Sequence, residues 1–196
     1  MIARPPPPLS LVVDTILQLT PADYAELAKR GFVARGGYLD VVKPDELAAC
    51  LDAGLGFIPI GYAHESHLSQ QALALGLPEG CTVYQDCEAE TGPAESVIAR
   101  VNACAADLES HNWQPGGYFG AQSLLTSAEL TSLAVTTYWK GCSRVLDRYG
   151  NAAEPARGYA LVQGRPPNVT IAGKTYDVSF VGNDYQDALP MWVWKS

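Results

Sequence analysis

Residues 9–31, LSLVVDTILQLTPADYAELAKRG, contain one complete strand–helix unit. The apolar run from Leu9 to Asp14 ends in a carboxylate, which is typical of a buried parallel strand whose carboxyl end opens onto a site. Thr20 then provides a helix N-cap, and it is followed by a proline and an early acidic residue. The predicted helix ends at Gly31. This stretch predicts the first unit of an α/β fold.

The same order of strand and helix recurs along the rest of the chain, with strand starts about 17 to 34 residues apart. Further strands are expected at 32–38, 56–62, 81–88, 116–120, 135–139, 158–163 and 176–181, and further helices at 43–53, 66–75, 93–111, 123–133 and 143–149. Strict alternation predicts a parallel sheet, and eight strands close naturally into a small (β/α)8 TIM-like barrel. An open, doubly wound sheet is the alternative, although the chain has neither GxGxxG nor GxxxxGK[ST] for a nucleotide site.

The barrel is expected to occupy residues 9–196 as a single domain, preceded by a proline-rich arm at residues 1–8. Pro5 to Pro8 predict an extended polyproline II segment, because each ring fixes φ and removes a donor. At the other end, Met191 to Trp194 form a dense apolar tail. This tail is expected either to seal the bottom of the barrel or to bind a partner.

Composition excludes several classes of protein. The chain has 196 residues, 47% hydrophobic and 17% charged, which is typical of one globular domain. Its formal net charge of −8 argues against nucleic acid as a partner. No apolar run is long enough for a membrane span, and no signal peptide is recognised at the N-terminus. Nothing in the sequence therefore marks the chain for a membrane or for export.

The cysteines and histidines indicate neither a cofactor nor a metal site. The five cysteines are scattered, and their spacing is not that of metal ligands. We expect them to be buried thiols, with a Cys81–Cys87 bridge as the alternative. The segment His64 to His67 lacks HExxH spacing, and no GxSxG nucleophile elbow is present. We expect no metal and no cofactor.

The fourth predicted strand carries two acids on one face. Residues two apart in a strand share a face, so Asp86 and Glu88 point the same way. Neighbouring carboxylates push their pKa values apart, which suits one proton donor and one anion. Glycoside hydrolysis needs such a pair. The alternative is that these residues simply begin a solvated loop.

Other polar and aromatic residues recur at the ends of the predicted strands, where barrel enzymes place their chemistry. They are Asp14, Tyr38, Asp40, Tyr62, His64, Glu65, Tyr118 and Gln163. Aromatic rings stack on the apolar faces of sugars, so Tyr62, Tyr84, Tyr118, Tyr138 and Trp139 are candidates for such contacts. Core packing is the alternative for these rings.

An ordered set of motifs over roughly residues 10–194 resembles the glycoside-hydrolase-like domains of phages and actinobacteria, which were once catalogued only as a domain of unknown function. That family is related to the family 25 lysozymes. The motifs are Val13-Asp14, Tyr38-Leu39, Lys43-Pro44-Asp45-Glu46-Leu47, Phe57-Ile58-Pro59-Ile60, Val83-Tyr84-Gln85-Asp86-Cys87-Glu88, Gly117-Tyr118-Phe119-Gly120 and Tyr176-Asp177-Val178-Ser179-Phe180.

The resemblance implies a lysozyme-like barrel with a carboxylate site, in a protein found in a host cytoplasm before release or in a phage virion and acting at the cell envelope. Glu88 matches the proton donor and Asp86 its partner, with Asp14 and Asp177 as additional rim carboxylates. Tyr38, Tyr62, Tyr118 and Gln163 are then the expected contacts to substrate.

Two hypotheses of different classes follow. The first is a glycosidase that cleaves peptidoglycan or a related amino-sugar polysaccharide, with Glu88 as general acid and Asp86 as the stabilising carboxylate. The second is a non-catalytic virion or envelope module that uses the barrel for binding or assembly. The proline-rich arm and the apolar tail motivate the second hypothesis, because both suit contacts with virion or envelope proteins.

Overall fold

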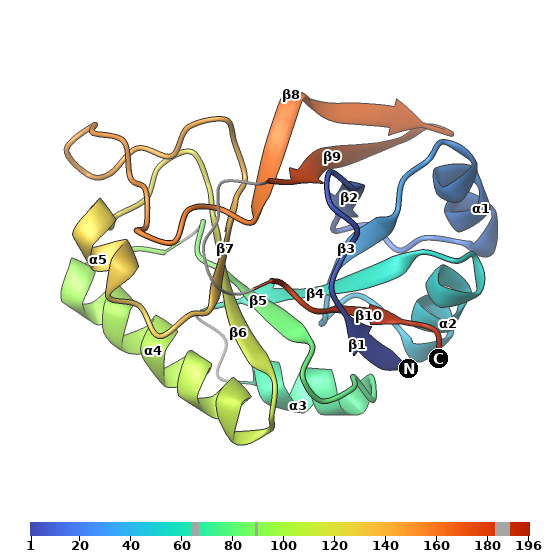
Figure 1. The fold of residues 1–196 in the computed structure, drawn as a ribbon, viewed down its shortest axis with the longest axis horizontal. Coiled ribbons are helices and arrows are strands. Elements are labelled where there is room, and N and C mark those ends of the chain that lie inside the picture. The colour runs from blue at the N-terminus through green and yellow to red at the C-terminus, as the bar shows by residue number, and fades with distance from the viewer. Residues whose placement is uncertain (64–66, 89, 183–188) are drawn as a thin grey trace.

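Eight strands form a closed barrel in the computed structural model, which describes residues 1–63, 67–88, 90–182 and 189–196 (Figure 1). Each strand pairs with the next, and the last pairs with the first. In order they are β2 (Leu11–Thr15), β3 (Ala34–Tyr38), β4 (Gly56–Tyr62), β5 (Thr82–Asp86), β6 (Gln114–Phe119), β7 (Thr137–Lys140), β8 (Leu161–Ile171) and β9 (Lys174–Val181). A closed barrel of eight strands is confirmed, whereas the full (β/α)8 repeat is not, and the open doubly wound sheet is excluded.

Strands β2 to β8 are parallel, whereas β9 runs antiparallel to both of its neighbours. We had expected the last strand to be parallel as well. β8 continues to Ile171, well beyond its predicted end, and turns directly into β9. Ala172 and Gly173 make this turn with φ values of 50° and 79°. A parallel strand would need a long crossover connection, so this short turn forces the antiparallel direction.

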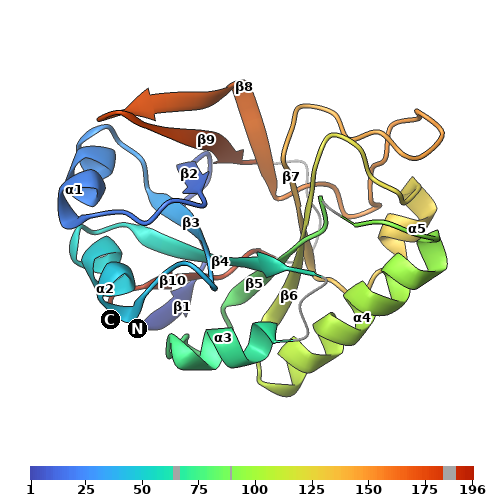
Figure 2. The same cartoon turned by 180° about the vertical axis from the view of Figure 1, so that it is seen from behind.

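Helices follow the first five barrel strands and cover the outside of the sheet (Figure 2). The described residues contain five helices, α1 (Pro21–Lys29), α2 (Pro44–Asp52), α3 (Leu68–Ala74), α4 (Ala94–Ser110) and α5 (Ser127–Thr131). Thr20 caps α1 as expected, since its side chain accepts a hydrogen bond from the Asp23 amide. Within this described part of the chain, no helix has the length and hydropathy to cross a bilayer.

The helix expected at 143–149 is absent, and this expectation was wrong. Asp147 Oδ1 accepts hydrogen bonds from the amides of Tyr149 and Asn151, both at 2.8 Å. An aspartate side chain that binds nearby amides favours a turn over a helix. The segment between β7 and β8 is therefore a loop, and it lies at the carboxyl end of the barrel.

The barrel interior is filled by aromatic and branched side chains. Trp139 is fully buried and makes edge contacts with Tyr84 and Tyr118, with ring centroids 5.4 and 4.9 Å away. Gly36 on β3 leaves room for it, because a Cβ there would lie 3.1 Å from the Trp139 ring. Two further apolar clusters lie between the sheet and the helices. The packed interior restricts any binding site to an end of the barrel.

The two termini lie side by side and close the other end of the barrel (Figure 1). β1 (Ile2–Arg4) pairs with β10 (Trp192–Trp194), and β10 pairs with β4. Trp192 and Val193 are fully buried. Of the two roles expected for the apolar tail, the structure thus supports sealing the barrel. The arm expected at residues 1–8 begins with a strand of this seal.

All five cysteines are free, so the alternative of a Cys81–Cys87 bridge was wrong. The two residues flank opposite ends of the extended strand β5. Six residues of strand span about 20 Å, whereas the Cα atoms of a disulfide lie within about 7 Å of each other.

Candidate active site

The structure brings the predicted site residues together at the carboxyl ends of the parallel strands. Seven of them occupy inward-facing positions near the ends of the barrel strands, namely Asp14, Tyr38, Tyr62, Asp86, Tyr118, Gln163 and Asp177. Asp14 and Asp177 are direct cross-strand partners. Asp86 is the partner of Tyr62 on one side and of Tyr118 on the other. Their positions agree with the expectation that these residues lie at one rim of the barrel.

Asp86 is a buried carboxylate whose two oxygens both accept hydrogen bonds. The Tyr38 hydroxyl donates to Oδ2 at 2.7 Å, and the Glu88 amide donates to Oδ1 at 2.9 Å. Such bonds favour the ionised form of a carboxyl group. Tyr38 in turn packs against Tyr62, with ring centroids 5.0 Å apart. Asp86 is thus held in place beside Glu88 by these two hydrogen bonds.

Glu88 follows the end of β5 and remains exposed to solvent, while its carboxylate packs against two glycines. A Cβ atom on Gly120 would overlap Glu88 Oε1, and one on Gly141 would lie 2.9 Å from it. Both glycines follow directly on the strands β6 and β7. Sequence reasoning missed their role, because it depends on a close approach that no local pattern reveals.

Although the residue as a whole is exposed, its carboxylate is partly desolvated by the adjoining strand ends, and this effect together with the charges of Asp86 and Asp177 raises the pKa of Glu88 from 4.5 to about 7. A carboxylic acid with a pKa near neutrality holds a proton that it can donate at pH 6 to 7. Glu88 therefore has the raised pKa that a general acid requires, and Asp86 is a neighbouring carboxyl group held by hydrogen bonds.

Asp14 is the most deeply buried acid of the site, with 5% of its surface exposed. Its Oδ2 atom has no hydrogen-bond partner among the described residues. Its pKa is raised to about 8, chiefly by burial and in addition by the charges of Asp177, Glu88 and Asp86, while Arg35 opposes the shift. The pKa of Asp177 is also raised by burial, while a hydrogen bond from Gln163 opposes the shift.

A cavity of about 400 Å³ opens between these groups. Three carboxylates line it, together with apolar and hydroxyl-bearing side chains. Its lining comprises Asp14, Thr15, Ile16, Leu17, Tyr38, Glu88, Tyr118, Thr175 and Asp177. Ile16 and Leu17 are 61% and 42% exposed, so they form an apolar lip at the opening.

The lip belongs to the connection between β2 and α1, which is anchored from behind by a buried ion pair. Arg35 Nη2 donates to the Leu17 carbonyl at 2.9 Å, and Arg35 Nη1 lies 3.3 Å from Glu46 Oε1. Glu46 Oε1 also accepts from the Leu19 amide at 2.9 Å. The pair therefore fixes the cavity wall at Leu17 and Leu19.

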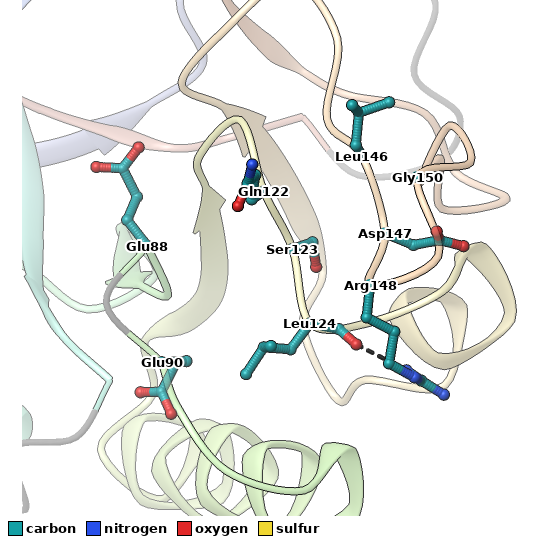
Figure 3. A pocket seen from close by; sticks show the side chains of 9 residues that line it. All are labelled: Glu88, Glu90, Gln122, Ser123, Leu124, Leu146, Asp147, Arg148 and Gly150. Carbon is teal, nitrogen blue, oxygen red and sulfur yellow. Dashed lines mark hydrogen bonds between the residues drawn. The ribbon is translucent and has the colours of Figure 1, made fainter.

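A second cavity, of about 420 Å³, also has Glu88 in its lining (Figure 3). Glu88 and Glu90 lie on one side of it, and the segments 122–124 and 146–150 lie on the other. Glu90 Oε2 accepts a hydrogen bond from Arg100. Its Oε1 atom is buried and has no hydrogen-bond partner among the described residues. Glu88 thus stands between two cavities.

The candidate aromatic contacts differ in their access to a ligand. Tyr84, Tyr138 and Trp139 are core residues, as the packing alternative predicted. Tyr38 and Tyr118 line the first cavity but are only 7% and 4% exposed, so they present edges and hydroxyl groups there. Gln163 donates to the Pro167 carbonyl at 3.1 Å.

His64 and Glu65 lie outside the described residues. Asp40 is described and exposed, just beyond the end of β3. Among the residues that the structure describes, no group of three or more His, Cys, Asp or Glu side chains is arranged to hold a metal ion.

Comparison with known proteins identifies the fold. No protein-family model matches the chain, and no curated protein matches it. The structure is similar to the 1.07 Å crystal structure of an uncharacterized protein from B. stearothermophilus, with a TM-score of 0.66. The match covers 89% of this chain and 96% of that chain at 15% sequence identity. At this identity the similarity shows a shared fold.

Proposed function

We propose that this protein is a glycoside hydrolase that cleaves peptidoglycan or a related amino-sugar polysaccharide at the rim of a reduced TIM-like barrel. The observation that carries the proposal is the pairing of Glu88 with Asp86. One group has a pKa of about 7, and the other is buried with a hydrogen bond to each oxygen. The motifs that resemble the glycoside-hydrolase-like domains of phages and actinobacteria support the same assignment.

The proposed reaction is a hydrolysis with a simple balance of atoms. Glu88 donates its proton to the glycosidic oxygen as the bond from that oxygen to the anomeric carbon breaks. Asp86 stabilises the positive charge that develops at the anomeric carbon. A water molecule adds its oxygen to that carbon and returns a proton to Glu88. The products are a new reducing end and a free hydroxyl group.

A matched pair of variants tests this proposal on purified peptidoglycan. Glu88→Gln removes the proton donor and should lower the release of reducing ends by about 100-fold or more. Glu79→Gln makes the same chemical change on an exposed residue near the opposite end of β5 and should leave the rate unchanged. An unchanged rate in Glu88→Gln would refute the assigned role.

A second candidate function is a virion or envelope module that binds without catalysis. It is favoured by an apolar cavity of about 400 Å³, which lies away from the carboxylates and is lined by Leu11, Phe32, Gly164, Asn168, Val169, Val178 and Phe180. Leu11 and Phe180 are 46% and 36% exposed there. A stoichiometric copy of the protein in purified particles, without glycan cleavage, would support this candidate and contradict the first.

A further inference from the structure

Among the described residues, carboxyl groups outnumber free basic side chains at the candidate site. Three of the nine described residues that line the first cavity are acids, and none of the nine is Lys, Arg or His. Among the described residues that line the second cavity, Arg148 alone is basic, and it is engaged by Glu129 through two hydrogen bonds. A ligand that spans Glu88 therefore meets a cluster of carboxyl groups.

One of these acceptors has no partner within the described protein. Asp14 is 95% buried and lines the cavity, yet its Oδ2 atom makes no hydrogen bond there. Burying a polar atom without a partner is costly, and a bound donor would offset that cost. Among the described residues, the acids that face Asp14 are Asp177, Glu88 and Asp86, Tyr38 and Tyr118 line the same cavity, and Arg35 lies behind the barrel wall. A cationic donor suits this surrounding better than a neutral one.

We propose that the substrate carries a free ammonium group, as in an N-deacetylated amino-sugar polymer, and that Asp14 is the counter-ion of that group. This inference rests on the proposed function, because it places the ligand in the same site. The apolar lip of Ile16 and Leu17 provides a surface for the sugar ring beside the charged group. The same charge pattern disfavours polymers of uronic acids.

Two tetrasaccharides with the same β-1,4 backbone provide the test, one of glucosamine and one of N-acetylglucosamine. Calorimetry on the intact protein at low ionic strength should show about tenfold tighter binding of the glucosamine tetramer. Added salt should reduce that preference. Asp14→Asn should lower the preference to about threefold or less, whereas Asp40→Asn, an exposed acid at the same rim, should leave it unchanged.

Proton release gives a second, independent readout. At pH 6 the Asp14 side chain, with a pKa of about 8 in the empty site, holds its proton. Pairing with an ammonium group ionises it, so calorimetry in two buffers of different ionisation enthalpy should detect proton release. The acetylated tetramer should release none, and neither tetramer should release a proton from Asp14→Asn.

The outcomes separate this inference from the proposed hydrolysis. Equal affinities for the two tetramers, together with cleavage of the acetylated one, would overturn the ammonium assignment and leave the hydrolase standing. Preferential binding of the glucosamine tetramer, without cleavage of either, would support the assignment and count against the hydrolase.

Discussion

At the end of the barrel where the parallel strands begin, β10 places Trp192 and Val193 in full burial among apolar neighbours. At the opposite end, four acids stand close together, and the pKa values of Asp14, Glu88 and Asp177 are raised. The first arrangement stabilises the fold. The second destabilises it at neutral pH, because burial and neighbouring acids disfavour the ionised forms that these carboxyl groups adopt freely in the unfolded chain. The two ends of the barrel therefore differ in what they contribute to the stability of the fold.

The largest expected effect is at the sealed end. Trp192→Ala removes a fully buried ring and should lower the free energy of unfolding by about 3 to 5 kcal/mol, measured by urea denaturation. Trp194→Ala is the matched control, since Trp194 is only partly buried and should cost clearly less. Equal losses in the two variants would contradict the role of Trp192 as the seal.

A substitution of Asp14 at the carboxyl end should stabilise the protein, in contrast to Trp192→Ala. The pKa of Asp14 is raised from 3.8 to about 8, so the folded state binds a proton more tightly than the unfolded chain. The stability that this proton provides is present below pH 4 and is lost as the pH rises to 8. The free energy of unfolding of Asp14→Asn should therefore rise relative to that of the wild type over this pH range, by roughly 2 kcal/mol or more at pH 8.

Urea denaturation of Asp14→Asn at pH 4 and at pH 8 measures this gain, with Asp40→Asn as the control. A gain that is the same at both pH values would show that ionisation of Asp14 is not its cause.

Substitutions of two glycines should distinguish an effect on activity from an effect on stability. Gly120→Ala places a methyl group against the Glu88 carboxylate and should reduce glycan hydrolysis about tenfold or more, by displacing the acid. Gly31→Ala is the contrasting variant, because Gly31 has a φ of 85° and open space around it. It should lose about 1 kcal/mol of stability and keep its activity. Full activity in Gly120→Ala would show that the position of Glu88 is not critical.

The smallest expected effect is on the pH profile. Glu88 must be protonated to act as the acid, and its pKa is about 7. The hydrolysis rate should therefore fall as the pH rises through 7 and reach about a tenth of its pH 6 value at pH 8. A rate that rises over this range would indicate that Glu88 acts in its ionised form.

Much of the barrel could be predicted from the sequence because local signals specify it. The capping residues around Thr20 set the start of α1, and the strand 56–62 was predicted with its observed bounds. The alternation of inward and outward side chains also placed Asp86 on the interior face. Those features depend on neighbours in the chain.

The remaining features depend on contacts between distant residues. β1 and β10 pair residues about 190 positions apart, which no periodicity reveals. The direction of β9 is set by the turn at Ala172, and the loop around Asp147 is set by side-chain bonds to amides. The glycines beside Glu88 likewise acquire their role only once β5, β6 and β7 are adjacent.

Digestion of purified peptidoglycan in isotopically labelled water tests the central claim most directly. Mass spectrometry should find soluble glycan fragments with one labelled oxygen at each new reducing end, and these fragments should be absent with Glu88→Gln. Intact glycan strands, or fragments without the label, would contradict the account of Glu88 and Asp86 as a hydrolytic pair.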